Sequence, residues 1–227
     1  VSETGWTSND ANIRVPGPDT VWTVLPSATD TNAQLTWNNG QGLIFTRTFS
    51  LDDQYLITVT DTVQNTGSTR AALTPYALLS QHGLPDDLSP GIVHEGAIGY
   101  VGDDYFTTSY GSWNDLADAP ETYTGARGWI GVTTRYFFIG LIPDQKDTTI
   151  FRTTYRGVIN AADANAKPRF QVDAQGPPRV IEPGHTITNS MRIFAGAKEL
   201  KTLETYEKNL SLTHFNLVVD YGWFYFL

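Results

Sequence analysis

The chain has 227 residues, no cysteine, a formal net charge of −9 and 12% aromatic residues. This length allows one large core, and the composition is that of a globular protein, not a disordered one. The absence of cysteine excludes disulfide bonds and thiolate chemistry. Because the chain is acidic and has no cluster of Lys and Arg, it does not resemble a nucleic-acid-binding protein or one that adsorbs strongly to anionic lipid.

Strand patterns dominate the first half of the chain. Residues 43–49 and 55–63 alternate polar and apolar side chains, which predicts two half-buried strands joined by a short hairpin at Asp52 and Asp53. The second strand is expected to end at Asn65-Thr-Gly67, a sequence that tolerates positive φ. Further strands are predicted at 72–79, 91–100 and 105–110.

The second half begins with a nearly continuous apolar run at 129–142, which predicts one strand buried on both faces at the centre of the domain. In the stretch 113–123, Pro120 limits any helix to one short turn. Many short strands without a dividing linker indicate an antiparallel sandwich or barrel. The remaining strands are predicted at 148–155, 169–173, 180–181 and 186–194.

One helix is predicted, over residues 197–210. Its apolar side chains follow a helical period and form a single stripe, which we expect to pack on the sheet. Glu204 and Lys208 form a favourable i,i+4 pair on the charged remainder of the surface. The stripe consists of Leu200, Leu203, Tyr206 and Leu210.

Few residues suggest catalysis. No two of the four histidines have the spacing of a compact metal motif, and there is no Gly-x-Ser-x-Gly nucleophile sequence. His94 with Glu95 or Glu121 is the one acid–base set that the sequence offers. Aromatic residues concentrate between two acidic loops, and Tyr105, Tyr110 and Trp113 are candidates to line a groove for a peptide or glycan. The alternative for these aromatic residues is ordinary core packing.

The last thirteen residues, 215–227, are apolar and aromatic, with no charge after Asp220. A bilayer span needs about 20 apolar residues, and Trp and Tyr favour the headgroup level. The run therefore predicts a junction with a following transmembrane helix, in which Asp220 stays in water while Tyr221 and Trp223 sit at the membrane interface. The alternative is a terminal strand that packs into the core.

Four stretches together resemble the large periplasmic domain of the Gram-negative YidC membrane protein insertases. They are the paired strands that end at Asn65-Thr-Gly67, the central run 128–143, the turn Glu182-Pro-Gly-His-Thr186 and the terminal run 215–227. Their order matches the family, and the resemblance extends over nearly the whole chain. It implies a mainly β fold, a two-sheet antiparallel supersandwich of the galactose-mutarotase type with a C-terminal α-helical element. The implied parts are a supersandwich at 1–195, a packed helix at 196–214 and a membrane junction at 215–227.

The resemblance also implies a function. The chain would be a non-catalytic domain without a cofactor, located in the periplasm and held at the inner membrane by flanking transmembrane helices. The whole protein would assist insertion and folding of nascent inner-membrane proteins, with or without the Sec translocon and its SecD–SecF partner. The alternatives are a carbohydrate- or peptide-binding module and a sugar epimerase on the same fold. The residues expected to couple the domain to membrane and partners are Leu200, Leu203, Tyr206, Leu210, Phe215, Asp220, Tyr221 and Trp223.

Overall fold

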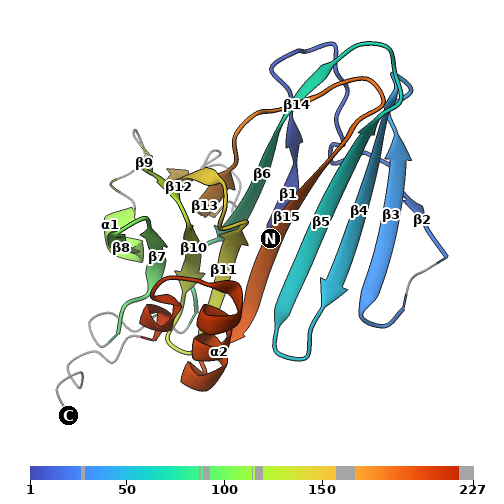
Figure 1. The fold of residues 1–227 in the computed structure, drawn as a ribbon. Coiled ribbons are helices and arrows are strands. Elements are labelled where there is room, and N and C mark those ends of the chain that lie inside the picture. The colour runs from blue at the N-terminus through green and yellow to red at the C-terminus, as the bar shows by residue number, and fades with distance from the viewer. Residues whose placement is uncertain are drawn as a thin grey trace.

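The computed structural model describes residues 1–26, 29–86, 88, 93–113, 115, 120–156 and 167–219. The chain forms two antiparallel sheets, and its longest helix follows the last strand (Figure 1). Within these ranges, no helix is long and apolar enough to cross a membrane.

The larger sheet has nine strands in the order β2-β3-β4-β5-β15-β11-β10-β7-β8. Every neighbouring pair in it is antiparallel. The bounds are β2 Thr23–Val24, β3 Asn32–Asn38, β4 Leu43–Leu51, β5 Leu56–Asn65, β7 Gly96–Val101, β8 Asp104–Ser109, β10 Gly128–Thr133, β11 Phe137–Pro143 and β15 Thr186–Ala197.

The smaller sheet has the order β1-β6-β13-β12-β9, and β14 pairs with β6 beyond the end of β13. The bounds are β1 Ser2–Thr7, β6 Ala71–His82, β9 Glu121–Ala126, β12 Thr148–Arg156, β13 Arg169–Gln175 and β14 Arg179–Ile181. The helices are α1 Tyr110–Trp113, α2 Leu200–Leu210 and the 3₁₀ helix η2 Phe215–Val218.

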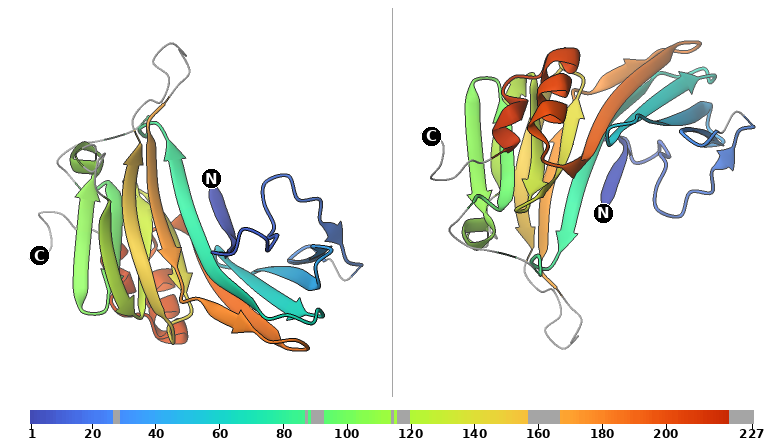
Figure 2. Two further views of the ribbon diagram at one scale, coloured as in Figure 1. Left: turned by 90° about the horizontal axis from the view of Figure 1, so that it is seen from above. Right: turned by 90° about the horizontal axis from the view of Figure 1, so that it is seen from below.

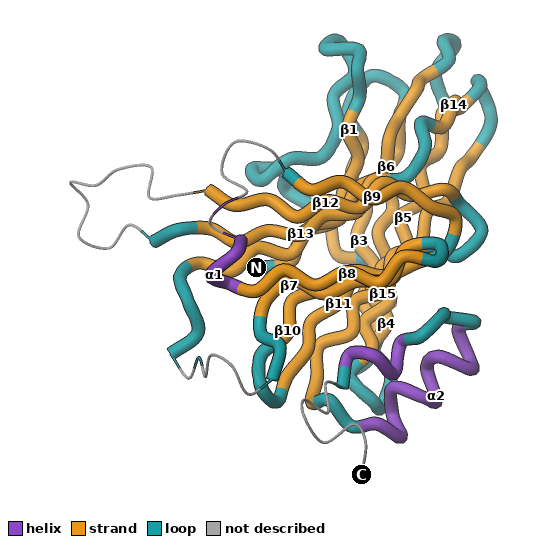
Figure 3. The backbone as a smooth tube through the Cα atoms, turned by 90° about the vertical axis from the view of Figure 1, so that its left-hand side faces the viewer, coloured by secondary structure: helices purple, strands orange, loops and turns teal. Residues whose placement is uncertain are grey.

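The elements stack in three layers: the smaller sheet, the larger sheet, and the α2–η2 unit on the outer face of the larger sheet (Figure 3). The core between the sheets includes Phe151, Phe170 and Leu141, and a second core lies beneath α2 and η2. The β2–β5 half of the larger sheet extends beyond the smaller sheet (Figure 2). There, a third cluster around Trp6 and Phe45 fills the space beside β1.

The side chains on the outer face of the larger sheet change from polar to apolar between one part of the sheet and the next. Between β5 and β15 it carries a ladder of hydroxyls, in which Thr60 lies 3.3 Å from Ser190 and Thr62 lies 3.3 Å from Thr188. Beneath α2 the same face is apolar and aromatic. Because β10 and β11 have a packed layer on each side, their sequence is apolar nearly throughout.

Two glycines make room for the aromatic layer under α2. Gly131 and Gly140 are opposite each other in the β10–β11 pair, and the Phe138 ring lies directly on both. A Cβ atom at Gly131 would overlap the Phe138 ring and the backbone oxygen of Ile139. The missing side chains therefore let a fully buried phenyl ring rest flat on the sheet.

Most predicted strands are confirmed, but five points of the prediction need correction. The run 129–142 is not one strand, because the chain reverses after Thr133 and forms β10 and β11. In the predicted strand 91–100, β7 begins at Gly96, and the strands β1, β2, β3 and β9 were not predicted. The predicted helix 197–210 begins at Leu200, because β15 continues to Ala197 by pairing with Phe137. The turn after β5 uses no positive φ. Instead, the Asn65 side chain bonds the carbonyls of Thr69 and Ile181 at 2.8 and 2.9 Å.

We predict that Gly131→Ala lowers the free energy of unfolding by about 1–3 kcal/mol, because the new methyl group overpacks the Phe138 ring and the β11 backbone. Gly17→Ala is the matched control, since a Cβ atom there meets nothing within 4 Å. Urea denaturation of both variants measures the effect. Equal midpoints for the two variants would contradict the packing assigned to Phe138.

Candidate functional site

The α2–η2 unit, residues 200–218, is the candidate functional site because the resemblance assigns coupling to this part of the chain. α2 packs on the sheet through Leu203 and Tyr206, which are buried, while Leu210 is half-buried. Leu200 was expected on the same stripe, but it is 37% exposed. Thr202 is buried in its place, and its hydroxyl donates to Glu199 at 3.1 Å.

The Tyr206 hydroxyl ties α2 to the β4–β5 hairpin. It donates to Asp52 Oδ2 at 2.6 Å and lies 2.8 Å from the Gln54 carbonyl oxygen. The other Asp52 oxygen accepts the backbone N–H groups of Gln54 and Leu56, so one carboxylate holds both the hairpin and the helix. Burial, followed by the hydrogen bond and negative charge of Asp52, raises the pKa of Tyr206 above its ordinary value.

A tight reversal follows the last turn of α2. Ser211 adopts a left-handed conformation, and its N–H bonds the Glu207 carbonyl. His214 is also left-handed, and its ring lies 4.9 Å from that of Tyr100 on β7. The Glu207 carboxylate then accepts the N–H of Asn216 at 2.9 Å. These bonds fold η2 back against α2.

Phe215 fixes η2 to the sheet. Its side chain is fully buried and contacts three rings edge-on: Trp129 at 5.3 Å, Phe138 at 5.9 Å and Phe194 at 6.0 Å between centroids. The indole N–H of Trp129 donates to the Thr213 carbonyl at 3.0 Å, which closes the loop onto β10. The chain therefore leaves the sheet from a fixed position.

The expectation that a membrane-facing segment starts at Phe215 is wrong. Phe215 and Val218 are buried in the core under α2, because the aromatic layer on β10, β11 and β15 offers them a closer apolar surface. The other predicted junction residues, Asp220, Tyr221 and Trp223, lie outside the described residues.

The predicted aromatic groove does not form. Tyr110 and Trp113 are 2% and 0% exposed, and they pack against Phe170 at 4.9 and 5.4 Å between ring centroids. Only Tyr105, at 46%, is exposed. α1 folds the two other aromatic residues into the core between the sheets, so ordinary core packing, the alternative interpretation, explains them.

A cleft of about 540 Å³ opens elsewhere, between β6 and the inner face of β5, β10, β11 and β15. Sequence reasoning missed it, since its walls come from six strands, and most of these are far apart in the sequence. Its apolar lining residues are Val1, Ile57, Leu79, Val132, Ile139, Ile193 and Ala195.

The acid–base candidates have structural contacts. His94 Nε2 lies 2.8 Å from the Ala97 carbonyl, and the buried Glu95 accepts the backbone N–H of Arg135 at 3.0 Å. The Glu121 carboxylate accepts hydroxyl hydrogens from Thr108 and Thr153. None of His94, Glu95 and Glu121 lines the cleft. Where the chain is described, no group of three or more His, Asp or Glu residues is placed to hold a metal ion.

We predict that Tyr206→Phe lowers the free energy of unfolding by about 1–2 kcal/mol, because the bond to a charged carboxylate is lost while packing is kept. Tyr136→Phe is the control, since Tyr136 is 58% exposed. Thermal unfolding of both variants at neutral pH tests this prediction. A Tyr136→Phe loss as large as that of Tyr206→Phe would refute it.

Alkaline pH should weaken the same bond. The pKa of Tyr206 is raised in the folded state above its ordinary value of 10.0, so the hydroxyl stays protonated there after it ionises in the unfolded chain. Its contribution to stability is therefore complete below about pH 10 and declines as the pH rises further. The melting temperature of the unmodified protein should fall more steeply above about pH 10 than that of Tyr206→Phe. Parallel pH profiles would contradict this assignment.

The YidC periplasmic domain family has a model that matches residues 1–227, the whole chain. Relatives named membrane protein insertase YidC from Rhizobium johnstonii and Methylobacterium sp. strain 4-46 are 36% and 37% identical over 100% of this chain. The chain spans 37% of the length of each of these two relatives.

A galactose mutarotase related enzyme from Lactobacillus acidophilus is similar in fold, with a TM-score of 0.53 at 10% identity. The alignment covers 78% of this chain and 71% of that enzyme. At this identity the likeness confirms the mutarotase-like supersandwich and implies nothing about catalysis. On the family match over its full length, this chain belongs to the YidC periplasmic domain family.

Proposed function

We propose that this chain is an accessory, non-catalytic domain of a membrane protein insertase and that the α2–η2 unit couples it to the rest of that protein. The domain stands in the periplasm beside the inner membrane. The whole protein assists insertion and folding of nascent inner-membrane proteins, alone or with the Sec translocon. The observation that carries the proposal is the burial of Phe215 among three rings of the sheet. This burial holds η2, the segment that follows α2, in a fixed position on the sheet.

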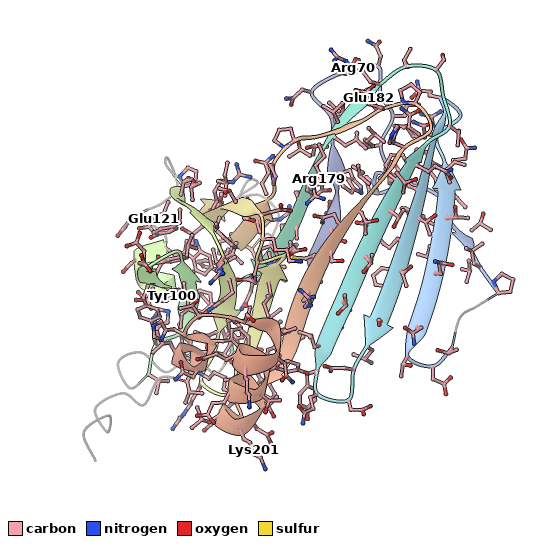
Figure 4. The ribbon with its side chains drawn as sticks, viewed as in Figure 1. Arg70, Tyr100, Glu121, Arg179, Glu182 and Lys201 are labelled. Carbon is pink, nitrogen blue, oxygen red and sulfur yellow. The ribbon has the colours of Figure 1, made fainter. Side chains whose placement is uncertain are left out.

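In this proposal the residues of the α2–η2 unit divide into two roles. Leu203, Tyr206, Leu210 and Phe215 hold the unit on the sheet, and their burial leaves them little surface for a partner. Contact with a partner falls to the exposed face of α2, which carries Leu200, Lys201, Glu204 and Lys208. Lys201 projects from the lower end of the helix, far from Arg70 and Glu182 at the opposite end of the sandwich (Figure 4).

The partners proposed for this face are the SecD–SecF subunits of the translocon. Its mixed charges and single exposed leucine suit a reversible interface with a polar rim. Asp220 stays in water and Tyr221 and Trp223 sit at headgroup level, as the sequence of the terminal run predicts. The rigid α2–η2 unit lies between the sandwich and the terminal run, so it would fix the orientation of the sandwich relative to the membrane.

The cleft favours one second candidate function, the binding of an extended apolar segment. Its lining is mainly aliphatic, and Ile139 at its edge is 44% exposed. Such a segment would be a nascent chain held before or during insertion. The cleft gives the peptide-binding alternative a location that the aromatic residues do not.

Photocrosslinking in cells tests the proposed function. A photoreactive residue is placed at Lys201, Glu204 or Lys208 in the full-length protein, with Glu182 at the other end of the sandwich as the control position. We expect translocon subunits to be captured from α2 and not from position 182. Equal capture at position 182, or none from α2, would contradict the coupling role. Capture of nascent chains from position 139 alone would favour the cleft instead.

A further inference from the structure

Exposed aromatic side chains gather at one end of the larger sheet. Where the chain is described, the exposed Tyr and Phe residues are Tyr55, Tyr105, Tyr136 and Phe137, with 52%, 46%, 58% and 60% exposed. Three of these four belong to the end where β5 and β11 begin and β15 stops. We call Tyr55, Tyr136 and Phe137 the aromatic end.

Backbone contacts bring the aromatic end together. The last residues of β15 lie between its members: the N–H of Ala195 donates to the Tyr55 carbonyl, and that of Lys198 donates to the Tyr136 carbonyl, both at 3.0 Å. Phe137 pairs with Ala197 in the sheet. Gly196 lies against the Tyr55 ring so closely that a Cβ atom there would be 2.7 Å from it. Leu200, the first residue of α2, follows directly.

The charges around the aromatic end are mixed. The Arg135 guanidinium lies 5.2 Å from the centroid of the Tyr136 ring, and Lys201 is exposed one residue beyond Leu200. Asp52 and Asp53 stand in the hairpin just before Tyr55. Lys198 and Glu199 add one charge of each sign, so the charges balance and give no net attraction to anionic lipid. Aromatic rings with polar tips, beside long basic side chains that can extend to water, suit the headgroup level of a bilayer.

The position of this end favours lipid over a folded partner. The ends of β5 and β15, together with α2 and η2, lie at the lower end of the molecule (Figure 1). η2 forms the start of the aromatic terminal run 215–227. No aromatic member of this end lines the described cleft; its exposed rings belong to residues at the ends of central strands.

We propose that the aromatic end is a lipid-docking surface, which rests at the headgroup level of a zwitterionic bilayer and sets the tilt of the domain. This inference rests on the proposed location beside the membrane. Rings at the interface and a fixed α2–η2 unit then constrain the sandwich at two points. A chain held only at its terminal run would be free to swing.

Depth-dependent fluorescence quenching tests the inference. The full-length protein is reconstituted in phosphatidylcholine vesicles, with an environment-sensitive fluorophore on a cysteine at position 136 or 137 and a quencher on shallow lipid positions. Position 105 is the matched control, because Tyr105 is similarly exposed but lies at the start of β8. We expect several-fold stronger quenching at positions 136 and 137 than at 105. Equal quenching at the three positions overturns the inference.

A double variant and a change of lipid sharpen the test. With the fluorophore at position 55, Tyr136→Ser together with Phe137→Ser should reduce quenching to the level at position 105, and unchanged quenching overturns the inference. Quenching that requires added phosphatidylglycerol also overturns it. These outcomes can be distinguished from those of the photocrosslinking experiment. Translocon capture from α2 without quenching at position 136 refutes only the lipid contact. Quenching at position 136 without translocon capture refutes only the coupling role of α2.

Discussion

The packing of Phe215 against Trp129, Phe138 and Phe194 is the interaction on which the rest of the α2–η2 unit depends. Full burial of a phenylalanine contributes about 1.5–3 kcal/mol, and each edge-to-face pair adds up to about 1.5 kcal/mol. Without it, η2 would be held mainly by the Trp129–Thr213 and Glu207–Asn216 hydrogen bonds. The position of η2 on the sheet thus depends on a core contact.

Two glycines in the larger sheet make this contact possible, although they destabilise the strands that contain them. Gly131 and Gly140 weaken a central strand pair, because glycine loses the most backbone freedom on folding. In return, Phe138 lies flat, and the aromatic layer becomes deep enough to receive Phe215. The same face carries hydroxyls between β5 and β15, outside the apolar cluster beneath α2 and η2. Side-chain chemistry on one sheet face therefore determines where the helical layer attaches.

Much of the fold could be predicted from sequence, since alternation and helical period report local burial. The predicted β4 and β5 hairpin, the late helix and the buried run at 129–142 are all present, although that run is two strands. Tertiary contacts caused the errors. Phe215 looked like the start of a membrane junction because hydrophobicity does not reveal whether lipid or three distant rings will cover it. Tyr110 and Trp113 were misplaced in a groove for the same reason, and the cleft is formed by strands far apart in sequence.

Hydrogen–deuterium exchange of the full-length protein in a membrane tests most directly the claim that α2–η2 is a rigid part of the sandwich. The amides of Leu203, Tyr206 and Val218 should be protected to the same extent as those of β10 and β11, because opening the unit would require removing Phe215 from the core. Phe215→Ala should abolish this protection while the smaller sheet stays protected. Rapid exchange throughout 200–218 in the unmodified protein, with β10 and β11 fully protected, would contradict the account.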